Sequence, residues 1–402
     1  MKTTTRISVF DPLKRFFQDA RAIGAVLVLC AVVSLLLSNA GPWQEAYRGF
    51  WSAGFDGTTD PHGHWGSWVF PNTPSLVIND GLMAIFFFLV GMEIKRELLR
   101  GELASAKQSL LPAMGAAGGM LAPALLFAFC NRNGQYLNGW AIPTATDIAF
   151  TLGMAGLLGK KIPVNLKIFV TALAIIDDLL AIAVIALFYG NELHTVYLLA
   201  AALVLLLLWL LNRYGKKFGI FHWLLGIVLW YCIYRSGIHA TIAGVLFACM
   251  VPAHALSRYE HDFHLPVYFL VIPVFALANT AMYIPPGISE RLAAPLSAGI
   301  LAGLCIGKPL GILGACYLLV RTRMAALPRG VNWQAMVGGA ILCGIGFTMS
   351  IFIASLAFND PGVQDISKTA VMTASLISAV AGSVWLRFAN TGDAITPQNK
   401  KG

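Results

Sequence analysis

Two aspartates stand side by side within an apolar stretch that is long enough to cross a lipid bilayer. The stretch ALAIIDDLLAIAVIALF covers residues 172 to 188 and carries Asp177 and Asp178. Each ionised side chain at mid-membrane costs about 3 kcal/mol on insertion scales, so ordinary packing does not explain the pair. Two carboxylates in one poorly solvated cavity repel each other, and a proton or a hard cation such as sodium relieves that repulsion. The pair is therefore predicted to bind protons or a cation; the alternative is a pair that merely ties helices together.

A third carboxylate lies in the stretch GWAIPTATDIAFTLG, which ends at residue 153. Pro143 has no N–H to donate and clashes with the carbonyl four residues earlier, so it weakens a helix at this point. The hydroxyls of Thr144 and Thr146 can satisfy backbone groups that the break leaves free. We therefore expect a broken helix beside Asp147, and broken membrane helices are a sequence pointer to a binding site.

Two more charged residues, Asp80 and Lys308, also fall inside apolar stretches. For Lys308 three roles stay open: neutralising the C-terminal end of a helix, pairing with an aspartate, or exchanging a proton. A second helix break is expected in GGAILCGIGFTMSIF, where Gly344 and Gly346 weaken the helix. Helix packing through small residues is the alternative explanation for these glycines.

The composition is that of an integral membrane protein. Of 402 residues 57% are hydrophobic and only 12% are charged, and the mean hydropathy is +0.71. The net charge of +9 comes without a nucleic-acid-binding motif or a dense basic tract, so no nucleic-acid partner is expected. The seven cysteines lie in apolar segments without CxxC spacing, which indicates neither a disulfide framework nor a metal site.

The apolar residues divide into runs of the length that an α-helix needs to cross a bilayer. Twelve spans are predicted, near residues 22–39, 74–92, 109–130, 137–158, 164–189, 194–211, 219–233, 237–252, 264–284, 295–320, 334–357 and 366–388. The N-terminus, the alternate loops and the C-terminus hold 22 of the 28 lysines and arginines, whereas the opposite loops hold five. Because positive charge gathers in cytoplasmic loops, both termini are predicted to be cytoplasmic.

The ends of the chain and one loop complete this organisation as a single transporter domain. Residues 1–21 are expected to be a cytoplasmic N-terminus and 389–402 a cytoplasmic tail. A cleaved signal peptide is the alternative for the first span. We expect this span to remain uncleaved, because the lysines and arginines of the later loops alternate as they would if the first span were retained. Residues 53–73 form the one sizeable external polar stretch, where SWVF is a candidate strand and His62 and His64 are expected to bind no metal.

The order of the spans suggests an internal repeat. Residues 109–189 and 295–388 each contain three spans with the break in the middle one. The charge pattern makes the two triplets run in opposite directions, as in transporters that are built from inverted repeats.

The sequence resembles a known family, the NhaA family of bacterial sodium/proton antiporters. The resemblance runs in order through most of the chain after residue 74. It is carried by INDGLMAIFFFLVGMEIKREL (78–98), WAIPTATDIAFTLG (140–153), LKIFVTALAIIDDLLAI (166–182), SGIHATIAGV (236–245), IPVFALANT (272–280), GKPLGI (307–312) and GIGFTMSIFIASLAF (344–358).

The resemblance implies an all-α fold of twelve transmembrane helices, two of them discontinuous and crossing near the membrane midplane. It implies that Asp178 is the principal sodium ligand, with Asp177 as its partner and Thr146 near the ion. Asp147 and Lys308 would offset the partial charges at the helix breaks, and Lys308 would be able to pair with Asp177. The two protons would be carried either by both aspartates or by Asp178 and Lys308.

The same resemblance implies electrogenic exchange of more than one proton per Na+ or Li+, activated at alkaline pH, in the bacterial inner membrane. The positions that match the family's pH response are Glu93, Arg96, Glu97 and Glu260, together with His239. No cofactor is implied, because the ions are substrates. The partners would be the lipid bilayer and a second copy of the chain, bound through residues 53–73.

Three other classes of function are alternatives to exchange. An intramembrane aspartyl protease also uses two membrane aspartates, but these stand on separate helices in a GxGD context, and no GxGD occurs here. A retinal protein uses an intramembrane lysine, but its seven-helix plan does not fit. The composition alone also allows a passive cation channel. Such a channel would differ from an exchanger by conducting sodium without moving protons.

Overall fold

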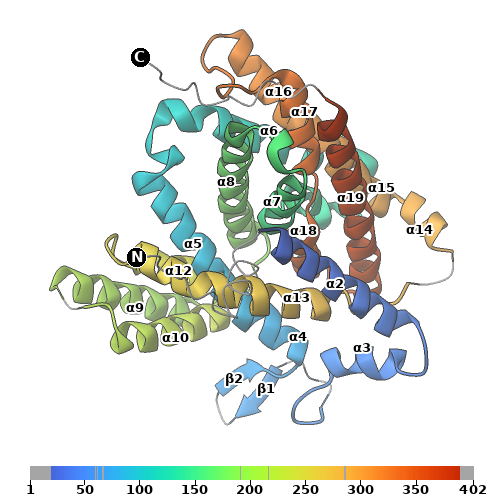
Figure 1. Ribbon diagram of the computed structural model, residues 1–402. Helices are drawn as coiled ribbons and strands as arrows, with labels where there is room; N and C mark the ends of the chain where they lie inside the picture. Colours follow the sequence, from blue (N-terminus) through green and yellow to red (C-terminus); the bar gives the residue numbers. More distant parts are fainter. Residues whose placement is uncertain are drawn as a thin grey trace, which may run out of the picture.

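The computed structural model describes residues 20–58, 60, 62–65, 68–190, 192–215, 217–284 and 287–389. Most of the two segments expected to be cytoplasmic ends, 1–21 and 389–402, therefore lies outside the described residues. What is described is a bundle of helices with one small sheet (Figure 1).

The helices of the first half of the chain include α8, which carries the aspartate pair. They are α2 (Ala20–Asn39), α3 (Gln44–Ser52), α4 (Pro74–Leu76), α5 (Met83–Arg100), α6 (Ala106–Cys130), α7 (Ile148–Leu157), α8 (Val164–Phe188) and α9 (Thr195–Arg213). Asp177 and Asp178 lie on α8, and α6, α7 and α17 (Trp333–Leu342) pack against that helix. Both aspartates are buried, and α8 lies within the bundle between α5 and α7 (Figure 1).

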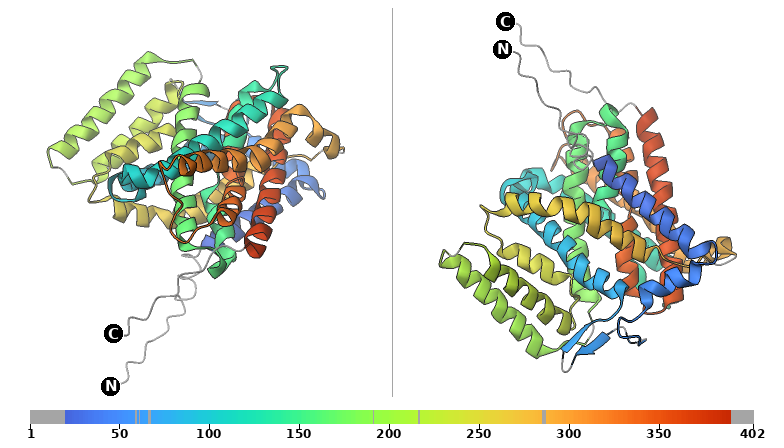
Figure 2. Two further views of the ribbon diagram at one scale, coloured as in Figure 1. Left: turned by 90° about the horizontal axis from the view of Figure 1, so that it is seen from above. Right: turned by 60° about the horizontal axis from the view of Figure 1, so that its bottom comes forward.

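The second half supplies the remaining α-helices. They are α10 (Ile220–Arg235), α11 (Ile242–Met250), α12 (Leu256–Pro266), α13 (Ile272–Asn279), α14 (Ile288–Ala293), α15 (Pro295–Ala302), α16 (Lys308–Arg321), α17, α18 (Phe347–Ala357) and α19 (Pro361–Phe388). Helices α9 and α10 lie side by side at the edge of the bundle away from α19 (Figure 2).

Six short helical turns interrupt or join these helices. The 3-10 turns are η2 (Glu102–Ala104), η3 (Leu137–Thr144) and η4 (Gly159–Lys161), and the π-helical turns are η1 (Val77–Leu82), η5 (Val267–Val271) and η6 (Gly303–Gly307). The π turns join α4 to α5, α12 to α13 and α15 to α16, so that each pair forms one continuous helical run.

Within the described residues, eight helical runs are long and apolar enough to cross a membrane, and a ninth is added if the bent pair α17 and α18 counts as one span. The protein is therefore a multi-pass membrane protein. The other three predicted spans correspond to shorter elements: α10, α11, and the pair formed by η3 and α7. The total of twelve stays a prediction.

The polar stretch 53–73 contains a β-hairpin at the end of the molecule opposite the segment between α16 and α17 (Figure 1). Its strands β1 (His62–Trp65) and β2 (Trp68–Pro71) pair in antiparallel register, with His62 opposite Pro71. The amide of Asn72 donates to Oδ1 of Asp56 at 2.8 Å. That hydrogen bond is the main reason why the pKa of Asp56 is lowered to about 2, so this carboxylate stays ionised at the base of the hairpin.

Helices α6 and α16 touch backbone to backbone, because two glycines face each other. A Cβ built on Gly118 would lie 2.3 Å from the carbonyl oxygen of Gly311, and a Cβ on Gly311 would lie 2.0 Å from that of Gly118. Neither position has room for a side chain. This close contact sets the position of α16, which begins at Lys308.

We expect Gly311→Ala to lower the free energy of unfolding by about 1–3 kcal/mol, because the added methyl group must push the two helices apart. Gly314→Ala is the matched control on the same helix, since a Cβ there meets nothing within 4 Å. The control should be neutral or slightly stabilising, because alanine favours a helix more than glycine does. Thermal unfolding in detergent measures both variants, and equal effects would contradict the close contact.

Candidate functional site

The two predicted helix breaks meet at the centre of the bundle. In the first break η3 ends at Thr144, residues 145–147 are extended, and α7 begins at Ile148. In the second, α17 ends at Leu342 and α18 begins at Phe347 after a bend of 46°. The N–H of Asp147 donates to the carbonyl oxygen of Ile345 at 2.7 Å, so the two breaks are hydrogen-bonded directly to each other.

Gly344 is required in the second break, because a backbone carbonyl approaches it closely and cannot move aside as a side chain can. A Cβ on Gly344 would lie 2.5 Å from the carbonyl oxygen of Leu304, and a Cβ on Gly346 would lie 2.1 Å from the hydroxyl of Ser350. In the first break the hydroxyl of Thr146 donates to the carbonyl oxygen of Cys343 at 3.1 Å. The hydrogen bond from Thr146 satisfies a backbone carbonyl that the interrupted helix leaves without a helical partner.

Asp147 caps the N-terminal ends of both half-helices at once. Its Oδ1 accepts from the N–H of Phe150 in α7 at 2.9 Å. Its Oδ2 accepts from the N–H of Thr348 in α18 at 3.1 Å and from the hydroxyl of the same residue. Because a helix N-terminus carries a partial positive charge, one buried carboxylate here offsets two of them.

Lys308 is fully buried and holds the opposite charge at the same place. Its Nζ donates to the carbonyl oxygen of Thr144, at the C-terminal end of η3, and lies 2.6 Å from Oδ2 of Asp177. The structure therefore contains two of the three predicted roles, namely neutralising a helix C-terminal end and pairing with an aspartate. The third role, proton exchange, stays a prediction.

The two neighbouring aspartates have different surroundings. Both are 2% exposed, but Asp177 is paired with Lys308, whereas Oδ1 of Asp178 has no hydrogen-bond partner among the residues that the structure describes. The difference follows from helix geometry, because successive side chains point about 100° apart. A buried carboxylate oxygen without a hydrogen-bond donor is suited to receiving a proton or a cation.

A cavity of about 570 Å³ borders the N-terminal half of α8, the helix that carries Asp178. It is lined by residues of α5, α6 and α8, among them Glu97, Gln108, Thr171 and Ile175. Thr171 and Ile175 precede Asp178 by seven and three residues, so they lie on the same helix face, one or two turns away. An ion that enters the cavity therefore comes within about one helical turn of Asp178.

Comparison with known proteins places the chain in a family. The model of the family described as Na+/H+ antiporter 1 matches residues 14–386. The chain belongs to this Na+/H+ antiporter family.

Named members of the Na+/H+ antiporter family match almost the whole chain. The Na(+)/H(+) antiporter NhaA 2 of Flavobacterium johnsoniae is 45% identical over 383 residues, which are 93% of this chain and 92% of that protein. The Na(+)/H(+) antiporters NhaA of Salmonella arizonae and Escherichia coli are each 44% identical over 384 residues, which are 93% of this chain and 97% of theirs. The relatives are named as transporters and not as enzymes, and the resemblance stated from the sequence is confirmed.

Four of the five residues expected from the sequence to take part in a pH response lie together at one end of α5. The guanidinium of Arg96 lies 2.6 Å from Glu260 on α12 and 2.8 Å from Glu97. Glu93, one turn earlier, is close enough to Arg96, Glu97 and Glu260 to interact electrostatically with them, and it also interacts with Asp178.

His239 lies elsewhere in this family member. Its Nε2 is 3.5 Å from Oδ1 of Asp80, and its Nδ1 is 3.0 Å from the hydroxyl of Thr241. Both His239 and Asp80 line a separate cavity of about 690 Å³ that His62 of the hairpin also borders. The structure therefore does not bring His239 together with the cluster around Arg96.

Sequence reasoning did not single out Thr348, which donates twice to Asp147. A signal was available, because this hydroxyl residue stands two positions after Gly346, in the first turn of the helix that follows the predicted break. Its partner, however, lies 201 residues away in the sequence, and only the folded chain identifies it.

Proposed function

We propose that the protein exchanges Na+ or Li+ for protons across the membrane. The metal cation and the protons compete for the carboxylate oxygens of Asp177 and Asp178. Two or more protons per ion make the exchange electrogenic, and activity rises at alkaline pH. Membership of the Na+/H+ antiporter family supports this activity. The observation that carries the site assignment is the buried Asp178 oxygen that no described donor satisfies, within about one helical turn of a cavity.

In this proposal Asp178 is the principal ligand, and Asp177 and the hydroxyl of Thr146 complete a set of oxygen ligands. Hard cations prefer oxygen ligands. The Thr146 hydroxyl uses its proton in the bond to Cys343, so its oxygen lone pairs are left to accept a cation. Sodium binding at Asp177 competes with Lys308 for the same carboxylate.

Two assignments of the carried protons follow from that competition. In the first, Asp177 and Asp178 each take one proton when sodium leaves. In the second, the protons reside on Asp178 and on Lys308, which loses its proton when sodium displaces it from Asp177. Both are compatible with the observed ion pair between Lys308 and Asp177.

Asp147 and Lys308 act in the proposal by charge compensation, which keeps the two broken helices stable in an apolar surrounding. The pH response is assigned to Glu93, Arg96, Glu97 and Glu260, because the Arg96 ion pairs link α5 to α12 beside the cavity that leads to the site. His239 would contribute from its separate cavity through Asp80.

The proposal also takes over the architecture expected from the sequence. Residues 109–189 and 295–388 form an inverted repeat within twelve transmembrane helices, and their two discontinuous helices cross near the membrane midplane. Both termini face the cytoplasm of a bacterium, and the protein resides in its inner membrane. A second copy would bind through residues 53–73, where the two-stranded sheet offers strand edges for pairing.

The full-length protein reconstituted into liposomes tests this function. We expect an imposed gradient of Na+ or Li+ to drive proton movement in the opposite direction, read from a pH-sensitive dye trapped inside. Choline serves as the control cation. Short-circuiting the membrane potential with valinomycin and K+ should accelerate the exchange, because charge builds up when more than one proton moves per ion.

Two results would contradict the proposal. Sodium uptake without any proton movement would indicate the channel that the composition left open. A rate insensitive to the membrane potential would indicate one proton per ion and remove the electrogenic part of the proposal.

A further inference from the structure

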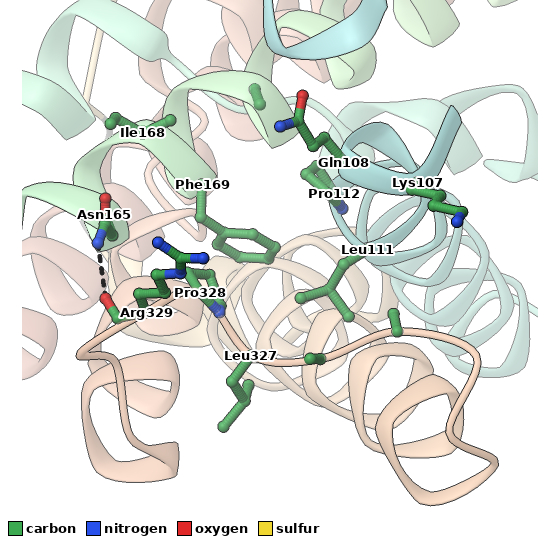
Figure 3. A pocket seen from close by; sticks show the side chains of 13 residues that line it. Lys107, Gln108, Leu111, Pro112, Asn165, Ile168, Phe169, Leu327, Pro328 and Arg329 are labelled. Carbon is green, nitrogen blue, oxygen red and sulfur yellow. Dashed lines mark hydrogen bonds between the residues drawn. The ribbon is translucent and has the colours of Figure 1, made fainter. Parts of the chain in front are cut away.

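A second cavity, of about 450 Å³, lies where the N-terminal turns of α6 and α8 meet the segment that joins α16 to α17. Figure 3 shows Lys107 and Gln108 of α6 on one side of it and Asn165 of α8 with Arg329 of the joining segment on the other. The side-chain amide of Asn165 donates to the carbonyl oxygen of Arg329 at 2.6 Å. That hydrogen bond fixes the joining segment against α8 and places Arg329 at the cavity.

The two charged residues that line this pocket are both positive. Lys107 and Arg329 line it, and no carboxylate is among its lining residues. Within the described part of the chain, neither cation forms an ion pair. The first turns of α6 and α8 contain no acidic residue either, so the partial positive charges of two 25-residue helices add to those of the side chains.

The floor of the pocket is apolar. Leu111 and Phe169 are buried there, and Leu327 lies beside them (Figure 3). Ile168, which also lines the pocket, is 40% exposed on the outside of α8. Because α6 and α8 are each long enough to span a membrane, their ends lie at the depth of the lipid headgroups. The pocket thus combines donors for an anion with an apolar surface at the membrane boundary.

We propose that this pocket binds an anionic phospholipid, with the headgroup phosphate between Lys107 and Arg329 and the start of an acyl chain over Phe169. Basic pockets between membrane helices are suited to anionic headgroups. The amide of Gln108 can donate to the same phosphate. A phospholipid fits better than free phosphate, because free phosphate would leave the apolar floor unused. The inference does not depend on ion exchange.

Native mass spectrometry of the full-length protein in detergent tests this inference with phosphatidylglycerol as the probe. Phosphatidylcholine and inorganic phosphate are the two comparison probes. We expect phosphatidylglycerol to be retained in preference to both. The double variant Lys107→Gln with Arg329→Gln should weaken the tightest binding about 30-fold, because each cation near the membrane surface strengthens binding of anionic lipid roughly fivefold.

Two further variants distinguish lipid binding in the pocket from a general effect of positive charge on lipid binding. Arg321→Gln with Arg387→Gln removes the same charge from exposed residues that do not line the pocket, and it should retain the lipid. Ala326→Trp fills the pocket without changing charge, and it should lose the lipid. Undiminished binding in both pocket variants would overturn the inference. Equal retention of phosphatidylcholine, or equal binding of inorganic phosphate, would overturn the assignment to an anionic lipid.

Discussion

Replacing Asp178 by asparagine is expected to lower sodium-driven proton exchange by about 100-fold or more. The amide has nearly the same size but neither ionises nor carries a proton. A unit charge about 4 Å from a cation is worth roughly 4 kcal/mol at an effective dielectric constant of 20, and each 1.4 kcal/mol is a factor of ten in binding. Exchange is measured in liposomes that contain equal amounts of each variant.

The matched control for Asp178 is Asp262→Asn. Asp262 is an exposed aspartate on α12 that pairs with Arg258 one turn away, and exposed pairs of this kind contribute little. The control should therefore exchange within about twofold of the unchanged protein. Full exchange by the Asp178 variant would remove this residue from the proposed site.

Replacing Asp147 is expected to destabilise the protein more than any other change at the helix breaks. The carboxylate accepts from the N–H of Phe150 and from both donors of Thr348. Its removal leaves buried donors without an acceptor, at about 1–3 kcal/mol each. We expect Asp147→Ala to lower the free energy of unfolding by about 3 kcal/mol. Asp147→Asn should lower it less, because one oxygen remains an acceptor.

A double-mutant cycle checks whether Asp147 acts through Thr348. Thr348→Val removes the hydroxyl and leaves the N–H, so it should cost about 1 kcal/mol. Combined with Asp147→Ala, it should add almost nothing, because the hydroxyl's acceptor is already absent. Thr373→Val on α19 is the control, since that hydroxyl bonds only within its own helix, to the carbonyl oxygen of Thr369. Additive effects of the two changes at the break would contradict the shared capping.

The residue types in the sequence predict the candidate site residues and the helix breaks, but residue types alone do not predict which of these residues contact one another. Asp177 and Asp178 attract attention because carboxylates are costly in an apolar stretch, and Pro143 and Gly344 predict breaks because of their backbone chemistry. Which aspartate pairs with Lys308 depends on the rotation of α8 relative to α16. That rotation is set by contacts between residues 131 apart in the sequence, and helical periodicity alone does not contain it.

The bounds of the predicted spans agree with the helices of the structure to different degrees. The predicted span 164–189 corresponds closely to α8, which ends one residue earlier, at Phe188, because apolar residues continue on both sides of the two aspartates. The predicted span 237–252 contains only the nine residues of α11 as helix. The predicted span 264–284 overlaps a helical run that begins earlier, at Leu256, and ends earlier, at Asn279. Hydropathy detects the apolar core of a span, whereas the charged turn from Leu256 to His264 gives no such signal.

Proton release on sodium binding tests the central claim most directly. Calorimetric titration of the purified protein with NaCl, in two buffers of different ionisation enthalpy and at several pH values, counts the protons released per sodium ion. If sodium and protons compete for the same carboxylates, sodium binding releases protons and the affinity for sodium rises with pH. Asp178→Asn then abolishes the proton release and the pH dependence. Sodium affinity that is independent of pH, with no proton released at any pH, would contradict the account.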